Sequence, residues 1–250
     1  MKLENKVAVV TGGSSGIGLA AAHELRANGA RVALFARDER SLESAKEALG
    51  GGVVTVAGDV RNVADLDRLF DETERRLGKV DVVVAAAGIA KFAPLPAMTE
   101  AMFDELADIH FKGAFFTVQR AVSHMRDGGS VILVSSSPAQ SQGAPMTSVY
   151  NAAKAAVRSL GRSLATELLP RRIRVNTLSP GLTNTPILTR DIGIAAELRD
   201  EIARAFVAKI PVGRLGEAAD MAKAILYLAS DDSRYVVGAE LAVDGGLAQL

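Results

Sequence analysis

Short runs rich in β-branched residues alternate along the whole chain with longer segments in which apolar residues recur at helical spacing. This alternation predicts parallel strands joined by crossover helices. Several runs are apolar throughout, as is typical of strands that helices cover on both faces. The predicted strands span residues 6–11, 31–36, 53–57, 80–85, 130–135, 174–178 and 240–243. The predicted helices span residues 15–27, 38–49, 62–77, 99–126, 148–169, 195–208 and 217–230.

No repeat, low-complexity tract or linker interrupts this alternation. Open α/β folds of this length commonly form one unit. A chain with 48% hydrophobic and 23% charged residues can bury a core of that size. The sequence therefore predicts an α/β fold with a single domain over residues 1–250. That domain is doubly wound and Rossmann-type, with a central parallel sheet flanked by helices on both faces.

The charge balance and the residue types present exclude several function classes. Lys plus Arg equal Asp plus Glu at 29 each, so no overall charge attracts nucleic acid or an anionic membrane. Cysteine is absent and the three histidines are scattered, so we expect no metal site. The N-terminus does not resemble a signal peptide, and the longest uncharged apolar run, 82–90, is too short for a membrane helix. We therefore expect a cytoplasmic protein with a small-molecule partner and no nucleic-acid or membrane partner.

A glycine-rich loop follows the first predicted strand and opens an alanine-rich helix. Gly12 permits a turn, while Gly16 and Gly18 let the backbone approach a pyrophosphate at the positive end of the helix. The spacing is G-x-x-x-G-x-G rather than the G-x-G-x-x-G fingerprint. An ordinary glycine turn is the alternative. The order of strand, glycine loop and helix nevertheless favours nucleotide binding.

Two residues at strand ends bear on the choice of nucleotide. Where an NAD enzyme usually presents an acid to the ribose, this chain has Arg37 after the second strand. The guanidinium fork suits a 2′-phosphate, which favours NADP(H), although a solvated arginine is the alternative. After the third strand, Asp59 has two possible roles: a hydrogen bond to adenine, or the N-cap of the following helix.

Tyr150 and Lys154 lie at i and i+4, so a helix sets both on one face. A nearby ammonium favours the phenolate and lowers the pKa of a tyrosine, which otherwise lies near ~10. Tyr150 could then give a proton to a developing alkoxide or take one from an alcohol. A serine cluster, residues 135–137, ends the fifth strand at the edge where open sheets bind ligands. The alternative for Tyr150 and Lys154 is an ordinary, partly exposed helix. The alternative for the serine cluster is a turn of small polar residues.

Together with Asn176-x-x-x-Pro180-Gly181 and Val243-Asp244-Gly245-Gly246, these motifs resemble the short-chain dehydrogenase/reductase family over essentially the whole chain. The resemblance implies that Tyr150 is the acid/base, that Lys154 binds ribose and modulates the phenol, and that a serine polarises the carbonyl. Thr185 is implied to hold the nicotinamide carboxamide. The implied cofactor contacts are Gly12, Ser14, Ser15, Gly16, Ile17, Gly18, Arg37, Asp59, Val60, Ala86, Gly88, Tyr150, Lys154, Pro180, Gly181, Thr183 and Thr185.

The position of the carbonyl-binding serine depends on the direction of counting. Family spacing back from Tyr150 selects Ser137, while counting forward from Gly129 selects Ser136. Ser137 is preferred, because the loop to Tyr150 then keeps the family's usual length with Gly143 in register.

The chain departs from the family pattern at two places. The usual Asn-Asn-Ala-Gly reads Ala85-Ala86-Ala87-Gly88, so two amide side chains are missing. His110 stands where the family usually has a catalytic asparagine. That asparagine acts largely through its backbone carbonyl, which His110 also has, so the relay is expected to survive. A structural role and a catalytic role both remain open for His110.

The expected reaction moves a hydride between NADP(H) and a ketone or secondary alcohol. Residues 186–211 are expected to form a substrate lid, with apolar residues Ile187, Leu188, Ile192, Ile194, Leu198, Ile202 and Phe206. The expected walls of the substrate site favour an uncharged, bulky ketone, because they include the apolar residues Phe92, Leu95 and Met146. One alternative is reduction of a 3-oxoacyl thioester on a carrier protein, which Arg120, Arg126, Arg171 and Arg172 could bind. Another is a nucleotide-binding regulatory protein. The resemblance also implies a homotetramer.

Overall fold

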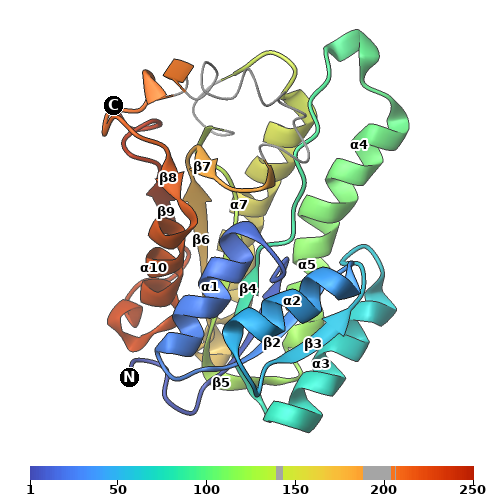
Figure 1. Ribbon diagram of the computed structural model, residues 1–250, viewed down its shortest axis with the longest axis vertical. Coiled ribbons are helices and arrows are strands. Elements are labelled where there is room, and N and C mark those ends of the chain that lie inside the picture. The colour runs from blue at the N-terminus through green and yellow to red at the C-terminus, as the bar shows by residue number, and fades with distance from the viewer. Residues whose placement is uncertain (139–142, 188–203, 206) are drawn as a thin grey trace.

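The computed structural model describes residues 1–138, 143–187, 204–205 and 207–250 (Figure 1). In this part of the chain a seven-stranded parallel sheet has the order β3-β2-β1-β4-β5-β6-β9. A separate parallel pair joins β7 and β8. The strands are β1 Val7–Thr11, β2 Arg31–Ala36, β3 Val54–Ala57, β4 Val80–Ala85, β5 Met125–Val134, β6 Arg174–Pro180, β7 Thr183–Asn184, β8 Gly216–Glu217 and β9 Glu240–Val243.

Helices connect the strands and cover both faces of the sheet (Figure 1). The α-helices are α1 Gly16–Ala27, α2 Glu39–Leu49, α3 Val63–Leu77, α4 Glu100–Ala107, α5 Gly113–Ala121, α7 Ser148–Leu168 and α10 Ala218–Ala229. Short 3₁₀ turns are η1 Leu95–Ala97, η3 Leu169–Arg171 and η5 Asp231–Ser233, and η2 Asp108–Lys112 is a π-helix. This arrangement confirms the predicted α/β fold with a doubly wound sheet. Within the described residues no helix has the length and hydropathy needed to span a membrane.

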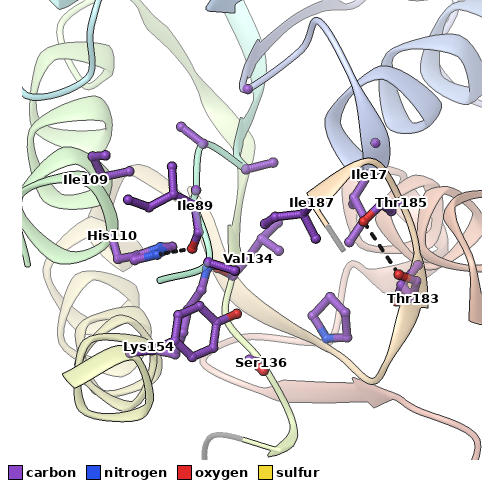
Figure 2. Close-up of a pocket in the computed structure, with 18 of the residues that line it drawn as sticks. Ile17, Ile89, Ile109, His110, Val134, Ser136, Lys154, Thr183, Thr185 and Ile187 are labelled. Atoms are coloured by element: carbon purple, nitrogen blue, oxygen red, sulfur yellow. Dashed lines mark hydrogen bonds between the residues drawn. The ribbon is translucent and has the colours of Figure 1, made fainter. Parts of the chain in front are cut away.

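The strand order reverses direction between β1 and β4, because the chain winds outward through β2 and β3 and then returns to the other side of β1. In open α/β sheets such a switch point creates a crevice at the carboxyl ends of the strands. These ends lie toward the top of Figure 1, and the side chains that gather there are drawn in Figure 2.

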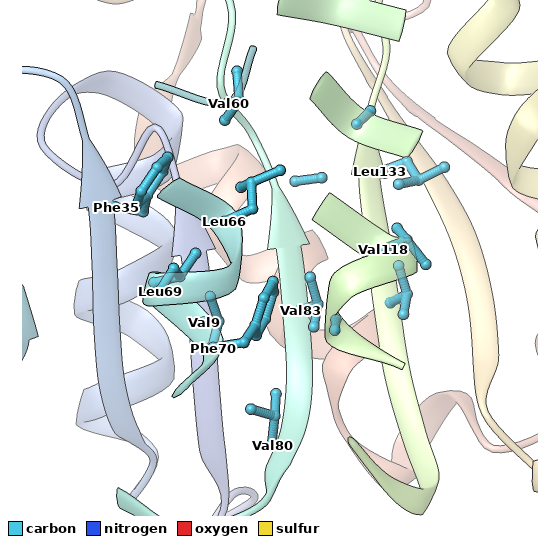
Figure 3. Packing of buried hydrophobic residues seen from close by; sticks show 14 of the residues in the cluster. Val9, Phe35, Val60, Leu66, Leu69, Phe70, Val80, Val83, Val118 and Leu133 are labelled. Atoms are coloured by element: carbon cyan, nitrogen blue, oxygen red, sulfur yellow. The ribbon is translucent and has the colours of Figure 1, made fainter. Parts of the chain in front are cut away.

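Alternate residues of each central strand supply two separate cores, as the two-residue period of a strand requires. In β1, Val7 and Val9 pack into the cluster under α3, α5 and α7, while Ala8 and Val10 pack under α1, α2 and α10. Figure 3 shows the first cluster, in which Phe70 and its neighbours on α3 lie against the strands. Burial on both faces explains why the runs that predict these strands are apolar throughout.

The segment predicted as one helix over residues 99–126 is interrupted in the structure. The π-helix η2 separates α4 from α5, and β5 already begins at Met125. Met125 pairs with Val80, and the Val80 N–H donates to the His124 carbonyl at 2.9 Å. Sheet pairing therefore outweighs the helical pattern at the end of this segment. Of the predicted helix 195–208 and lid 186–211, most residues lie outside the described part of the chain.

Candidate active site

A cavity of about 640 Å³ lies at the carboxyl ends of the strands. It continues from the glycine loop past the end of β2 to the amino end of α7. Of the residues named from the sequence for cofactor binding and catalysis, all but Ser137 line it. Its remaining lining includes Phe92, Asn151, Ile187, Lys209 and Leu247.

Glycines close the loop between β1 and α1 more tightly than any side chain would allow. A Cβ on Gly18 would lie 2.2 Å from the Gly12 carbonyl oxygen, far inside van der Waals contact. Gly12 has φ of +69°, and a Cβ there would lie 2.8 Å from the Ala86 carbonyl oxygen. The glycines at 12 and 18 are therefore required by the backbone itself, and they bring α1 against the end of β4.

The amino end of α1 is left open toward the cavity. Its N-cap, Ser15, makes no side-chain cap hydrogen bond, and no acid lies in the first turn. In contrast, Asp38, Asn62 and Thr99 each accept a backbone N–H at the start of α2, α3 and α4. The free N–H groups and the positive end of the α1 dipole fit an anionic group such as a pyrophosphate.

The end of β2 presents a cation to the same cavity. Arg37 is exposed and lines the cavity. The neighbouring Asp38 carboxylate accepts from the Ser41 N–H at 2.7 Å and from the Ser41 hydroxyl at 2.6 Å. These two hydrogen bonds lower the pKa of Asp38 and hold it as the N-cap of α2. Asp38 thus caps α2, and both Asp38 and Arg37 line the cavity.

Asp59 is not the N-cap of the following helix, and that alternative is wrong. The cap of α3 is Asn62, whose side chain accepts from the Ala64 N–H. The Asp59 carboxylate instead accepts from the Arg61 backbone N–H at 2.9 Å and from the Arg61 guanidinium at 2.6 Å. Burial opposes the charged form, but these hydrogen bonds win and lower the pKa of Asp59. Asp59 and Val60 both line the cavity.

Tyr150 lies in the first turn of α7, and its ring is held between two others. Phe92 and His110 both meet it edge to face, with ring centroids 5.5 and 5.4 Å away. Burial raises the pKa of the Tyr150 phenol, and a hydrogen bond with the Ser136 side chain opposes that rise. The net shift of the Tyr150 pKa is upward, opposite to the lowering expected from Lys154, so the phenol is protonated at neutral pH in the protein alone, the form that can donate a proton.

Lys154 follows one turn later, and the residue is only 6% exposed. The ammonium donates to the Val134 carbonyl at 3.0 Å, and the Ser135 hydroxyl donates to the Lys154 carbonyl at 2.8 Å. Burial lowers the pKa of Lys154 to about 8. The predicted i, i+4 pair is thus on one helix face, with the ammonium fixed under the end of β5.

The structure favours Ser136 over Ser137, the residue preferred from spacing. Ser136 lines the cavity and hydrogen-bonds Tyr150. Ser137 is buried outside the lining, and its N–H donates to the Pro180 carbonyl at 2.9 Å. This placement supports the count forward from Gly129 rather than the count back from Tyr150.

His110 is buried in the π-helix, with 2% of its surface exposed. Its Nε2 lies 2.9 Å from the Ile89 carbonyl oxygen, the contact drawn as a dashed line in Figure 2. Burial, and then the charge of Lys154, lower the pKa of His110 well below its usual 6.5. The imidazole is therefore neutral at physiological pH.

Residues after β6 form the opposite wall. Pro180, Gly181, Thr183 and Thr185 all line the cavity. A Cβ on Gly16 would lie 3.5 Å from the Thr185 Cβ, so this threonine sits directly over the glycine loop. The Thr183 hydroxyl donates to the Gly181 carbonyl at 3.0 Å, and Figure 2 shows both threonines across the cavity from His110.

The structure supports only part of the predicted substrate wall. Phe92 and Met146 line the cavity, but Leu95 is 81% exposed and is absent from the lining, so that prediction is wrong. Leu95 belongs to the short turn η1, which projects beyond the cavity. Of the predicted lid 186–211, Pro186, Ile187 and Lys209 line the cavity, whereas Leu188, Ile192, Ile194, Leu198, Ile202 and Phe206 lie outside the described residues.

Sequence reasoning missed Leu247, which also lines the cavity. The Val243-Asp244-Gly245-Gly246 motif offered a signal for Leu247. The Asp244 carboxylate accepts from the N–H groups of Gly246 and Ala248, which turns the C-terminus back over the site. Lys209 lies within the predicted lid 186–211, although the sequence did not single it out.

The four arginines considered for a carrier-protein patch lie around the amino ends of β5 and β6, opposite the cavity. Arg120 pairs with Asp67 at 3.4 Å, and Arg171 pairs with Asp127 at 2.8 Å. Arg126 lies 3.9 Å from the Asp81 carboxylate. Acids therefore lie near three of the four arginines, Arg120, Arg126 and Arg171.

Although positions 85 and 86 lack the amide side chains of the family, a close backbone contact forms there. Ala85 ends β4, and the Ala86 N–H donates to the Thr11 carbonyl at 3.3 Å. This bond continues the pairing of β4 with β1 and holds Ala86 and Gly88 at the cavity.

Comparison with known proteins gives a consistent picture. Residues 12–248 match the family model described as Enoyl-(Acyl carrier protein) reductase. The chain is 39% identical to oxidoreductase asL5 of Sarocladium schorii, over 100% of this chain and 98% of that protein. It is 37% identical to the NADP-dependent (R)-specific alcohol dehydrogenase of Lentilactobacillus kefiri, over 98% of this chain and 97% of that protein. A blue fluorescent protein from a metagenomic library, solved in complex with NADPH, superposes with a TM-score of 0.91 at 33% identity, over 99% of this chain and 100% of that one.

Proposed function

Since this chain belongs to the short-chain dehydrogenase/reductase family, we propose that it transfers hydride between NADP(H) and a ketone or secondary alcohol of fairly apolar character. The family membership makes it an oxidoreductase of alcohol and carbonyl groups that uses a nicotinamide cofactor. The contact between the Tyr150 phenol and Ser136 inside the cavity is the observation that carries the proposal.

In the direction of reduction, Tyr150 donates the proton. A bound nicotinamide would supply a hydride to the carbonyl carbon, which would place a negative charge on the carbonyl oxygen. Ser136 and Tyr150 both offer hydroxyl hydrogens to that oxygen, so they orient the carbonyl and stabilise the developing alkoxide. Tyr150 then transfers its proton to the alkoxide, and the resulting phenolate must be stabilised.

Lys154 provides that stabilisation. Its ammonium lies one helical turn from Tyr150 and is fixed by the Val134 carbonyl. A buried positive charge favours the phenolate over the phenol, because little water screens the interaction. The same ammonium is available to a ribose hydroxyl, which gives Lys154 the second role that the family resemblance implies.

For the cofactor, the open amino end of α1 suits the pyrophosphate and Arg37 suits a 2′-phosphate. The Asp38 carboxylate, which accepts from Ser41 and stays ionised, partly offsets the charge of Arg37. The proposal includes a preference for NADP(H), which rests on Arg37. Thr183 and Thr185 are assigned to the nicotinamide side of the site.

The substrate assignment follows from the walls near Tyr150. Phe92, Met146, Ile187 and Leu247 are apolar and line the cavity. An apolar wall favours an uncharged ketone, since a sugar would leave several hydroxyls without partners. Delivery of an acyl group by a carrier protein is less favoured, because the arginines that could bind such a carrier lie at the opposite end of the sheet.

Assembly as a homotetramer is a further part of the proposal. It rests on family resemblance, and the described chain offers exposed aromatic side chains for it on α4 and η2, namely Phe103 and Phe111. Light scattering after size-exclusion chromatography measures the assembly directly.

The proposed function is tested by following nicotinamide absorbance with a panel of ketones, alcohols and sugars and with both cofactors. We expect turnover of bulky ketones with NADPH. If cofactor binds but no ketone or alcohol turns over, the chain is a nucleotide-binding regulatory protein and the proposal is wrong. Turnover of sugars alone would contradict the substrate assignment.

A further inference from the structure

Met146 has a backbone conformation that a residue with a side chain disfavours. Its φ is +69°, in the left-handed region that glycine occupies most readily. Among the described residues, the other non-glycine residues with positive φ are Asn5 and Arg172, and neither of them lines the cavity. Met146 does line it, so one strained position lies at the candidate active site.

A tight turn imposes this conformation. The Thr147 N–H donates to the Ala144 carbonyl at 3.4 Å, which closes a four-residue turn over 144–147. Pro145 occupies the second position of the turn and Met146 the third, where φ is positive, as in a type II turn. Type II turns favour proline at the second position and glycine at the third. This chain therefore has methionine at the position where the turn itself favours glycine.

Several hydrogen bonds fix the turn. The Thr147 hydroxyl donates to the Ala144 carbonyl at 2.8 Å and accepts from the Asn151 side-chain amide at 2.9 Å. The Met146 carbonyl accepts from the Ala93 N–H at 3.1 Å. Strained residues persist where their surroundings determine the backbone in this way, and they cluster at ligand sites.

Core packing does not account for methionine at position 146. The residue is 47% exposed and belongs to neither of the two hydrophobic clusters of the described chain. Its bond to Ala93 instead ties it to the residue that follows Phe92, and the Phe92 ring meets the Tyr150 ring edge to face at 5.5 Å. Phe92 and Met146 therefore belong to one apolar wall next to the catalytic phenol.

We propose that Met146 is a specificity-determining residue, which contacts the larger substituent of the ketone and favours substrates in which that substituent is a bulky apolar group. This inference rests on the proposed function, because Tyr150 must hold the carbonyl oxygen for the wall to meet the substituents. A thioether side chain is unbranched and polarisable, so it adapts to the outline of varied apolar groups. Glycine would relieve the backbone and remove this contact, so stability and specificity oppose each other at this position.

A set of substitutions separates the strain from the wall. Met146→Gly removes both. Met146→Ala removes the wall and keeps the strain, because alanine still carries a Cβ. Met146→Leu keeps an apolar side chain of similar volume together with the strain. Arg172→Gly is the matched control for strain, because Arg172 is exposed, has φ of +57° and does not line the cavity.

The first measurement compares kcat/KM for cyclohexyl methyl ketone and for acetone. Met146→Gly and Met146→Ala should each lower the ratio of the two values about tenfold, the scale of losing part of a buried apolar contact. Most of this loss should fall on the bulky ketone, and Met146→Leu should retain most of the ratio. Equal losses for both ketones, or an unchanged ratio in Met146→Gly and Met146→Ala, would overturn the proposal.

The second measurement is thermal unfolding. The midpoint should rise by about 2 °C or more in Met146→Gly and in Arg172→Gly, because glycine adopts positive φ without strain. Met146→Ala should show no such rise. A midpoint that falls in Met146→Gly would show that the position is not strained, and the opposition between stability and specificity would be wrong.

A binding measurement distinguishes this inference from the proposed function. Cyclohexanecarboxamide and acetamide have the shapes of the two ketones, but nicotinamide does not reduce an amide. In calorimetric titrations of the cofactor-bound protein, Met146→Gly should lower the affinity for the first amide relative to the second by about tenfold. If it does while no ketone turns over, the inference stands and the proposed reaction fails. If ketones turn over while the affinity ratio is unchanged, the inference is wrong and the proposed reaction stands.

Discussion

The Tyr150 phenol hydrogen-bonds the side chain of Ser136, whereas Ser137 is bound through its backbone to the Pro180 carbonyl. The two adjacent serines therefore have different surroundings, so a substitution of one serves as the control for the same substitution of the other. We expect Ser136→Ala to lower kcat by ~10² or more, since it removes a hydroxyl that would stabilise the alkoxide. Ser137→Ala should keep turnover close to wild type. Steady-state kinetics with the best ketone decide it, and the reverse ranking would restore Ser137 as the catalytic serine.

Replacing the phenol tests the general acid directly. Tyr150→Phe should reduce turnover by ~10² or more and leave the dissociation constant for the cofactor within a few-fold. The aromatic packing against Phe92 and His110 does not need the hydroxyl, so thermal unfolding should also be close to wild type. Near-normal turnover in this variant would show that another group supplies the proton.

Cofactor preference is tested at the end of β2. Arg37→Ala should weaken NADPH binding by ~1.5 to 3 kcal/mol, the scale of a hydrogen bond to a charged group, and leave NADH binding nearly unchanged. Arg40→Ala, a nearby exposed arginine on α2 outside the cavity lining, is the matched control. Titration calorimetry with both cofactors measures the difference. The assignment of Arg37 to the 2′-phosphate fails if both cofactors weaken equally.

Burial of the Lys154 ammonium should lower the free energy of unfolding of the wild-type protein at neutral pH. Its pKa is about 8 in the folded protein and 10.5 in the unfolded chain, so the unfolded state binds more protons and wild-type stability rises between these pH values. Lys154→Met should therefore be more stable at pH 7 by about 2 kcal/mol, since ~3 from the shift is offset by ~1 for the lost bond to Val134. The advantage should vanish above pH ~10.5. Urea unfolding across this range checks it, with Lys223→Met as an exposed control on α10.

The depressed pKa of His110 predicts a loss of stability in acid. Below pH 6.5 the unfolded chain takes up a proton at this position while the folded protein does not, so stability falls as the pH decreases. The slope for one such group is ~1.4 kcal/mol per pH unit, and His110→Gln should remove it. His23→Gln, on an exposed residue of α1, serves as the comparison. Parallel unfolding curves for wild type and His110→Gln between pH 5 and 6.5 would contradict the buried neutral imidazole.

Much of the fold could be predicted because its determinants are local. Strands covered on both faces must be apolar throughout, and the predicted run at 31–36 coincides with β2. The glycine loop could be recognised because the close approach of Gly18 to the Gly12 carbonyl excludes every side chain. Tyr150 and Lys154 followed from helical spacing alone.

Other features depended on contacts between segments distant in sequence. The predicted helix over residues 99–126 ends early because Met125 pairs with Val80, a sheet neighbour that helical periodicity does not detect. The same limit applies to Leu95, whose apolar side chain suggested a wall but which projects into solvent.

The sequence by itself determined the alternation of strands and helices, the glycine loop and the Tyr150–Lys154 pair. Each of these features depends on residues that lie close together in the sequence. Only the tertiary structure decided which serine meets Tyr150, since the two counts along the sequence disagree and the contact depends on how the end of β5 packs against α7. It also decided the state of His110, because the Ile89 carbonyl that fixes its tautomer comes from another segment of the chain. Burial and hydrogen-bond partners are properties of packed segments, and a linear pattern does not contain them.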